Sequence, residues 1–512
     1  MYSRLTAILH SSSFSLLMLL VVCLVEAGWM ISNGLPFPGT DDLEFKQAGF
    51  ELVSNGRFAA PAFEGYYRGL EKVFLITPPL YPLTFALWIS LFGFSLKSSI
   101  TFGFVLRLLS TMALYVLVRK IHHFMSHWWA VLTAGSYFFL PDYMDRPEAL
   151  TTALGLFALL IVCSHPDRQG LLRGLMIGVL LGCACSAQPI VGGLYTIYVC
   201  ASLMGASSSG KTGIRRVTHV IAASVLTFLL IWSPLVLQNL EYFYHQFIQL
   251  FLKNIGWSTK ATIGSKVWAI SKWHTPLVFV FLLSGLIYCF TEREPFRRRF
   301  YLWQAGGVIA IILLSILFTP LKDTYHAALI PLIFVFGIGG IPSLKWRSGK
   351  PFRISSAASG MVAYFTLLIA SFFLYLLPSI RINLFPLTWT REDTYTYTLK
   401  RLHEQIPPGA SVLVGSTLWY ALAGRSVIYD GFFVWHAKMK ECDYIVSVNN
   451  GSGIPGRPML YKDDQMKEYR ERNFVVVDST LTPEPNRLIK IPISRFRWSY
   501  RFILYQRKSV YE

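Results

Sequence analysis

The sequence predicts an all-α polytopic membrane protein of about 11 spanning helices, with a small α/β domain at its C-terminal end. Of the 512 residues, 53% are hydrophobic and only 15% are charged. Apolar runs of about 18 to 20 residues recur along the chain, and a water-soluble domain could not cover so much hydrocarbon. The C-terminal domain is predicted by the return of charged and turn-forming residues after Trp389.

The first apolar run, Ser13 to Met30, follows Arg4 and resembles a secretory signal peptide in that arrangement. It is longer than an ordinary signal-peptide core, and no small-x-small cleavage site separates it from the acidic stretch that follows. We therefore expect it to remain as the first spanning helix of an integral membrane protein.

Basic residues collect in short polar gaps between the apolar runs, in a chain of formal net charge +19. This distribution follows the positive-inside rule, so it assigns the gaps to the cytoplasm and explains the charge without nucleic acid. The gaps are Arg119-Lys120, Arg168 with Arg173, Lys211-Arg215-Arg216, Arg293-Arg297-Arg298-Arg299 and Lys345-Arg347-Lys350-Arg353. The spans that keep every gap on one side are 11–31, 99–118, 127–141, 148–163, 171–187, 190–204, 218–237, 274–291, 301–319, 325–343 and 356–378.

The segment from Pro78 to Gly93 is apolar but only about 16 residues long. If it crossed the bilayer, every later basic gap would face outward, so we expect a helix embedded in the outer leaflet. The predicted domains are a transmembrane domain at 1–385, with an outer catalytic loop at about 32–98, and an extracytoplasmic domain at 386–512.

The C-terminal domain shows alternating helix and strand patterns. Residues 394–430 predict a helix, a Pro-Pro-Gly turn, a buried strand, a second helix and another strand. The stretches CDYIVSVNN and NFVVVDST predict two more strands, and no catalytic set is apparent. The sequon Asn450-Gly451-Ser452 matters only if the chain passes through a glycosylating compartment.

The stretch GASSSGKT, Gly205 to Thr212, matches the phosphate-binding pattern G-x-x-x-x-G-K-[ST]. That motif needs a preceding buried strand and a following helix whose amides face the phosphate. Here a predicted spanning helix precedes it. We therefore interpret the stretch as a flexible cytoplasmic loop in which Lys211 is a topology-determining charge.

Three carboxylates, Asp41, Asp42 and Glu44, open the first outer loop of this basic chain. One reading is a solvated loop in which Asp41 caps an amphipathic helix from Leu43 to Ser54. A cap needs only one acid, however, and unusual motifs follow this stretch. The pattern therefore favours a functional role for the acids.

Four segments of the N-terminal third carry a family resemblance: TDDLEF, SNGRFAAPAFEG, TPPLYPLTFALWISLFG and RLLSTMALYVLVRK. Together they resemble the first outer loop of membrane glycosyltransferases of the GT-C class, in the branch of the protein O-mannosyltransferases and the bacterial lipid A aminoarabinose transferase. The likeness covers about residues 10 to 165, and beyond them only the topology is similar. In two places the sequence departs from the family pattern: Asp42 stands where Glu is usual, and Thr77 stands where many members carry Lys or His.

The resemblance implies an inverting single displacement that transfers a sugar from a polyprenyl-phosphate donor at the outer face of the membrane. It implies Asp41 as the base that deprotonates or orients the acceptor hydroxyl, assisted by Asp42. Lys72 would supply the phosphate contact missing at Thr77 if the loop folds back. The stretch TPLKDTYHAALIPL resembles part of a donor-lipid site through Tyr325 and His326, although an interfacial anchor would explain it equally well.

Two charged residues in predicted spanning helices point to the same region. Glu148 begins the fourth span on the outer side, where a charge inside lipid is costly. Alternatively, Asp145 and Pro147 simply start that helix. Arg107 lies inside the second span, where a guanidinium needs a carboxylate or phosphate, so we expect it to pair with Asp41, Glu148 or the donor phosphate.

The predicted function is therefore a glycosyltransferase, hexosyl or pentosyl, in the bacterial inner membrane, with its active site facing the periplasm or exterior. The expected partners are the polyprenyl-phosphate sugar, membrane lipids and an unidentified lipid, glycan or protein acceptor, but no nucleic acid. No cofactor is identified, and a divalent ion is left open, with Asp42 and Glu148 as candidate ligands. The alternative is a non-catalytic flippase or transporter of lipid-linked sugars, which should carry ionisable groups near the bilayer midplane on broken helices.

Overall fold

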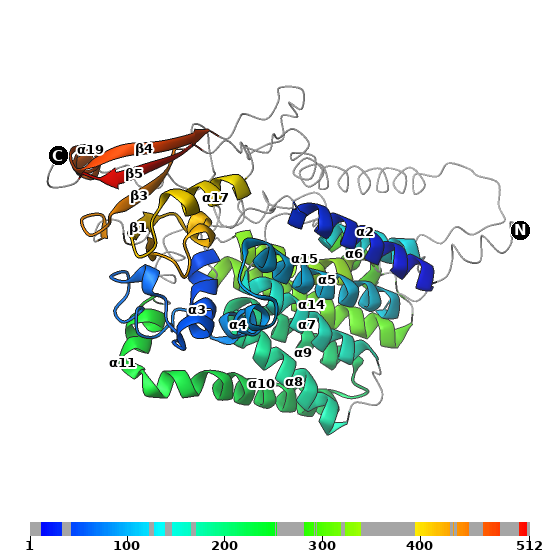
Figure 1. Ribbon diagram of the computed structural model, residues 1–512. Helices are drawn as coiled ribbons and strands as arrows, with labels where there is room; N and C mark the ends of the chain where they lie inside the picture. The colour runs from blue at the N-terminus through cyan, green and yellow to red at the C-terminus, as the bar shows by residue number, and fades with distance from the viewer. Residues whose placement is uncertain are drawn as a thin grey trace, which may run out of the picture.

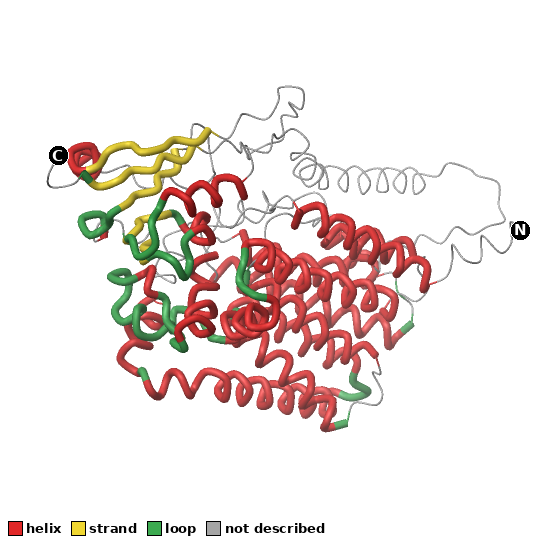
Figure 2. The backbone as a smooth tube through the Cα atoms, viewed as in Figure 1, coloured by secondary structure: helices red, strands yellow, loops and turns green. Residues whose placement is uncertain are grey.

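The chain forms a bundle of helices with a small mixed sheet at one end, as the ribbon in Figure 1 and the tube in Figure 2 show. The computed structural model describes residues 12–32, 42–121, 127–138, 146–164, 170–250, 281–290, 294–318, 323–338, 395–430, 438–449, 464–481 and 501–508, with residues 252, 292 and 434. All structural statements below concern these residues.

The described part of the chain contains five helices that are long and apolar enough to cross a membrane. They are α2 (Ser12–Ser32), α5 (Leu96–Ile121), α7 (Pro147–Ser164), α9 (Pro189–Ala206) and α10 (Gly210–Gln238). The bundle also contains α6 (His127–Phe138), α8 (Leu171–Ala187), Phe281–Phe290, α14 (Pro295–Phe318) and α15 (Asp323–Gly337). The protein is thus a largely helical integral membrane protein. The count of eleven spans stays a prediction, because the span expected at 356–378 lies outside the described residues.

The GASSSGKT stretch is a tight turn between two helices, so the expected flexible loop is wrong. The helix α9 ends at Ala206, and α10 starts at Gly210 rather than at 218. The Oγ of Ser209 accepts a hydrogen bond from the amide of Thr212 (3.2 Å) and caps α10. Arg299 of α14 donates to the carbonyl oxygen of Ser207 and fixes the turn. Basic residues in the first turns of α10 lower the local hydropathy, so the hydropathy pattern placed the start of the helix too far along the chain.

Three of the basic gaps lie together at one end of the described bundle. A cavity of about 370 Å³ brings together Lys120 at the end of α5, Cys163 near the end of α7, Ala206 at the end of α9 and Arg297 at the start of α14. In the described residues, three of the basic gaps therefore share one end, as the positive-inside pattern requires.

The stretch from Asp42 to Phe94, which the sequence predicts as the first outer loop and which keeps that name below, lies at the opposite end. The helix α10 has 29 residues and spans about 43 Å at 1.5 Å per residue, and its far end leads into α11 (Leu240–Phe243) and the π-helical turn η2 (Tyr244–Ile248). From η2, the side chain of Gln246 accepts from the amide of Leu75 (2.7 Å) and donates to the carbonyls of Arg68 (3.2 Å) and Val73 (3.0 Å). The loop after α10 therefore fixes the first outer loop in place.

The first outer loop is itself folded. It contains α3 (Asp42–Asn55), the 3₁₀ turn η1 (Pro61–Phe63) and α4 (Leu80–Phe92), the short apolar helix that the sequence predicts at 78–93. With 13 residues, α4 is too short to span a bilayer. Gly69 has a φ of +82°, and a Cβ there would overlap the Tyr242 ring at 2.3 Å, so only glycine allows α11 to approach so closely.

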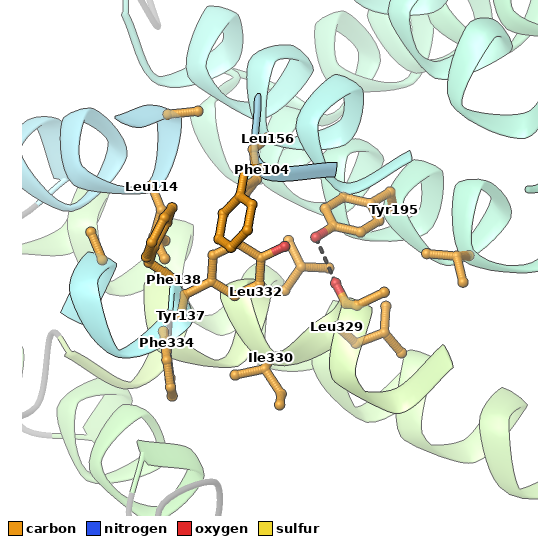
Figure 3. Close-up of a cluster of buried hydrophobic side chains, with 14 of the residues drawn as sticks. Phe104, Leu114, Tyr137, Phe138, Leu156, Tyr195, Leu329, Ile330, Leu332 and Phe334 are labelled. Carbon is orange, nitrogen blue, oxygen red and sulfur yellow. Dashed lines mark hydrogen bonds between the residues drawn. The ribbon is translucent and has the colours of Figure 1, made fainter. Parts of the chain in front are cut away.

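The centre of the bundle is a continuous apolar core to which five helices contribute. Figure 3 shows Phe104, Tyr137, Leu156, Tyr195 and Leu332 from α5, α6, α7, α9 and α15 around one point. The hydroxyl of Tyr195 donates to the carbonyl of Ala328 (2.8 Å) in α15, a helix interrupted by Pro331. This hydrogen bond joins α9 to α15.

The C-terminal domain is a five-stranded mixed sheet with strand order β2-β1-β3-β5-β4. The strands β1 (Ser411–Val414), β2 (Val427–Asp430) and β3 (Tyr444–Asn449) are parallel, and β5 (Arg501–Arg507) runs antiparallel to β3 and β4 (Phe474–Leu481). The helices are α17 (Tyr395–Gln405), the 3₁₀ helix η6 (Ser416–Ala421) and α19 (Asp464–Asn473). The predicted α/β character is confirmed, although the second helix is 3₁₀ and the sequence did not predict β5. The sequon Asn450 and the expected boundary at 385 lie outside the described residues.

Topology gives a first testable prediction. Because residue 210 and the first outer loop lie at opposite ends of the bundle, single cysteines introduced at Gly210 and at Glu404 of α17 should be labelled from opposite sides of the membrane. Cys442 should not interfere, because it is buried and its thiol donates to the carbonyl of Lys438 (3.0 Å), while burial raises the pKa of that thiol to about 12. Labelling both introduced sites with one impermeant maleimide in intact cells would contradict the map.

Candidate active site

The acid-bearing helix α3 begins at Asp42, two residues after Thr40, in agreement with the predicted helix at 43–54. Asp41 lies outside the described residues, and of Asp42 only the backbone is described. The first turn of α3 is fixed by Leu43 and Phe45, which are buried in one apolar cluster with Leu150 of α7. The start of α3 is therefore packed against the end of a membrane helix.

A buried lysine lies one turn beyond Asp42. Lys46 is fully buried, and its Nζ donates to the Oγ of Ser99 (2.7 Å) on α5 and to the hydroxyl of Tyr420 (3.4 Å) on η6. Those two hydroxyls are themselves 2.7 Å apart. Because residues i and i+4 share one face of a helix, Lys46 lies on the same face of α3 as Asp42. A lysine, a membrane helix and the C-terminal domain thus meet beside the acidic stretch.

Glu148 lies at the start of α7, as the sequence predicts, and only 1% of it is exposed. Its carboxylate pairs with Arg146, whose Nε and Nη2 lie 3.3 Å and 3.4 Å from its two oxygens. The guanidinium of Arg146 lies 5.1 Å from the centre of the Phe45 ring on α3. The ion pair therefore lies against the helix that carries Asp42, with both charges largely out of water.

Arg107 is buried in α5, and its Nη1 donates to the carbonyl oxygen of Phe138 (2.9 Å) at the end of α6. Its guanidinium also lies 5.9 Å from the centre of the Tyr137 ring. The described contact caps a helix C-terminus, where a cation is favourable. The pairing of Arg107 with Asp41, Glu148 or a donor phosphate stays a prediction.

The other predicted donor contacts come from two elements. Lys72 is exposed, and its Nζ lies 5.9 Å from the centre of the Tyr242 ring, so it belongs to the junction of the two outer loops. The Oγ1 of Thr77 is buried, with no hydrogen-bond partner in the described part of the chain. Tyr325 and His326 lie in the first turn of α15, and their side chains are outside the description.

Glu44 is partly buried. Tyr67 lies nearby: burial raises the pKa of its hydroxyl, a hydrogen bond with Tyr66 lowers it, and the negative charge of Glu44 raises it further. The third acid of the stretch is therefore partly shielded from solvent, and its charge acts on Tyr67.

The C-terminal domain is docked onto this loop. Trp419 of η6 is 1% exposed and packs edge-to-face on Phe50 of α3, with ring centres 5.7 Å apart. Lys438 bridges Glu64 of the loop (3.3 Å) and its own neighbour Glu441 (2.9 Å). Burial lowers the pKa of Lys438, but the two carboxylates outweigh it and raise that pKa overall. The domain therefore contributes to the surroundings of α3.

Sequence reasoning missed three residues of this region. Lys46 had a readable signal, since it follows Asp42 by four positions on a predicted helix. Arg146 had only its neighbour Glu148 as a signal. Tyr420 had none, because its contact joins residues 374 positions apart. Among the described residues, no group of three His, Cys, Asp or Glu side chains could hold a metal ion.

The variant Arg107→Lys tests the membrane cation. Lysine keeps the charge but lacks the planar fork that can hold a carbonyl and an anion together. We expect the predicted glycosyltransferase activity to fall about tenfold at matched protein level, with expression retained. Wild-type turnover in that variant would show that Arg107 only contributes to packing.

Comparison with known proteins supports the fold. No protein-family model matches the chain, and no curated protein sequence matches it. The crystal structure of ArnT from Cupriavidus metallidurans bound to undecaprenyl phosphate is similar, with a TM-score of 0.58, 14% identity and coverage of 95% of this chain and 97% of that one. The Archaeoglobus fulgidus oligosaccharyltransferase tethered to an acceptor peptide is similar with a TM-score of 0.50, 12% identity and coverage of 85% and 69%.

Both neighbours are glycosyltransferases of the GT-C class. The fold therefore defines the class of structure: this chain has the fold of the GT-C membrane glycosyltransferases. The family resemblance found in the first 165 residues is thus confirmed at the level of fold, and it extends over nearly the whole chain.

Proposed function

We propose that the chain transfers a sugar from a polyprenyl-phosphate donor to an acceptor at the outer face of the membrane. The observation that carries this proposal is the cluster at the start of α3. There an acidic stretch adjoins the buried Lys46 and the Arg146–Glu148 pair, at the end of the bundle where the membrane helices meet folded outer loops. The neighbour with the same fold over 95% of this chain binds undecaprenyl phosphate.

The chemistry assigned to these residues is a single displacement. The acceptor oxygen attacks the anomeric carbon while the bond from that carbon to the phosphate oxygen breaks, and the electron pair leaves with the polyprenyl phosphate. Asp41 takes the proton of the acceptor and Asp42 orients it. The configuration at the anomeric carbon is inverted, because the acceptor oxygen attacks the face of that carbon opposite the departing phosphate.

Cations are needed where the negative charge develops on the leaving phosphate. Arg107 and Lys72 are the candidates from the first part of the chain, with Tyr325 and His326 of α15 as candidate hydrogen-bonding groups. If a divalent ion takes part, Asp42 is a better ligand than Glu148, because Arg146 already occupies both carboxylate oxygens of Glu148.

A flippase of lipid-linked sugars is the competing function, and one experiment separates the two. The purified chain in proteoliposomes would receive polyprenyl-phosphate mannose, glucose, arabinose and aminoarabinose in turn. Transfer predicts that one donor is consumed and that an equal amount of sugar appears on another molecule. Movement of an intact donor between leaflets without its consumption would favour the flippase.

A further inference from the structure

The cavity at the end of the bundle that carries the basic gaps lies outside the candidate active site. Its volume is about 370 Å³, and it is enclosed by the last turns of α5, α7 and α9 and the first turns of α14. The positive-inside pattern assigns this end to the cytoplasm. Pockets of about 300–1,000 Å³ hold drug-sized ligands, so the cavity is large enough for the headgroup of a lipid.

Three charged side chains line this cavity: Lys120, Glu294 and Arg297. The carboxylate of Glu294 accepts hydrogen bonds from the amides of Phe296 (3.1 Å) and Arg297 (3.0 Å). It also lies 3.3 Å from the Nε of Arg297, so these two charges offset each other. Lys120 forms no ion pair with any residue in the described part of the chain. The two cations and one carboxylate therefore leave the cavity with a surplus of one positive charge.

The other side chains in the wall are mostly apolar, among them Ile121 and Phe300. Phe296 also lines the cavity and is 38% exposed, and it begins a stripe of exposed apolar side chains along α14. The stripe covers about 26 Å at 1.5 Å per residue, close to the hydrocarbon thickness of a bilayer, which is about 30 Å. An exposed apolar surface of this length suits contact with lipid chains. The stripe continues from Phe296 through Leu302, Trp303, Ile309 and Leu313.

The charge and the apolar wall together restrict the class of ligand. An inorganic phosphate would satisfy the charge but would leave the apolar side chains in contact with water. An uncharged lipid would cover those side chains but would leave Lys120 without a counter-ion in a partly apolar site. The phosphodiester of an anionic phospholipid carries one negative charge and is covalently joined to acyl chains, so it supplies both contacts.

We propose that this cavity binds the headgroup of an anionic phospholipid of the cytoplasmic leaflet, with the phosphodiester beside Lys120 and an acyl chain along the apolar stripe of α14. Basic pockets between membrane helices on the cytoplasmic side bind anionic headgroups in this way. The bound headgroup joins the end of α5 to the start of α14. The site is independent of the proposed transfer, because it lies at the opposite end of the bundle from the acids of α3.

The test is lipid binding to the purified full chain in a non-ionic detergent, measured by native mass spectrometry as saturation of a one-to-one complex. Dioleoyl phosphatidylglycerol should bind more tightly than dioleoyl phosphatidylcholine, which has the same acyl chains and phosphate but no net charge. Lys120→Gln removes the surplus charge and should weaken the binding of phosphatidylglycerol about fivefold. Glu294→Gln removes the carboxylate and should strengthen that binding by a similar factor, an effect that a damaged fold could not produce.

Lys211→Gln is the matched control for Lys120→Gln. It removes an exposed lysine at the same end of the bundle, in the first turn of α10, that does not line the cavity, so binding should be unchanged. Excess inorganic phosphate should not displace the lipid, because it lacks acyl chains. The proposal would be overturned by equal affinity for the two lipids, by displacement with inorganic phosphate, or by unchanged affinity in Lys120→Gln. An equal loss in Lys211→Gln, or no gain in Glu294→Gln, would also contradict it.

Discussion

Asp41→Asn is expected to lower sugar transfer by about two to four powers of ten, the usual worth of a general base. Asparagine keeps the size of the side chain and its ability to cap α3, but it removes both the charge and the proton affinity. Donor binding should change far less, since the acid acts on the acceptor. The measurement is transfer of labelled sugar in membranes that contain matched amounts of each protein.

Two neighbouring variants serve as matched controls for this result. Asp42→Asn should be milder if Asp42 only orients the acceptor, and comparable if it holds a metal ion, in which case added divalent ion should partly restore transfer. Glu44→Gln should stay active, because the amide keeps the size of the side chain and Glu44 has no assigned role in the transfer. If the stretch only caps a helix, all three variants remain active, and a fully active Asp41→Asn protein removes Asp41 from the mechanism.

Lys46→Met is expected to have the second-largest effect, a loss of about ten- to hundredfold in turnover. Methionine fills a similar volume, but the ammonium group no longer donates to Ser99 and Tyr420, and a charged hydrogen bond is worth about 1.5–3 kcal/mol. Because Lys46 joins α3 to both α5 and the C-terminal domain, its loss should disturb the position of the acids at the start of α3.

A positioning role has its own signature. In Lys46→Met, turnover should fall while the KM for the donor changes little, and Tyr420→Phe should show a smaller effect of the same kind, because only one of the two hydroxyl contacts is lost. Lys400→Met removes an exposed lysine of α17 and should behave as wild type. Wild-type turnover in Lys46→Met would show that the buried contact is only structural.

The membrane architecture was predictable from sequence, because the length of an apolar run must match the thickness of the bilayer and basic residues collect on one side of it. The same signals misplaced the start of α10, since Lys211 and Arg215 lie inside the helix rather than before it. The short helix α4 was predictable because its apolar run cannot span. Strand β5 was not, because it pairs with β3 across about fifty residues of intervening chain and its own sequence, RFILYQR, is short and charged at both ends.

The site was only partly predictable. Asp41 and Asp42 stand out because acids are rare in a basic chain, and Glu148 because a charge at the start of a membrane helix is costly. The partners of these residues were not predictable, since they depend on three-dimensional packing. Arg146 forms an ion pair with Glu148, and Tyr420 of the C-terminal domain accepts a hydrogen bond from Lys46. No local sequence pattern predicts either contact.

The central claim is that this chain cleaves the bond between sugar and phosphate in a polyprenyl-phosphate sugar. The most direct measurement is the amount of free polyprenyl phosphate that is formed, determined by mass spectrometry. Proteoliposomes that contain wild-type or Asp41→Asn protein would receive each donor together with lipid and glycan acceptors extracted from the host membrane. The account predicts time-dependent release from at least one donor by wild type, and release reduced by at least a hundredfold in Asp41→Asn. Equal release by the two proteins, or release from no donor by wild-type protein that is correctly folded, would contradict it.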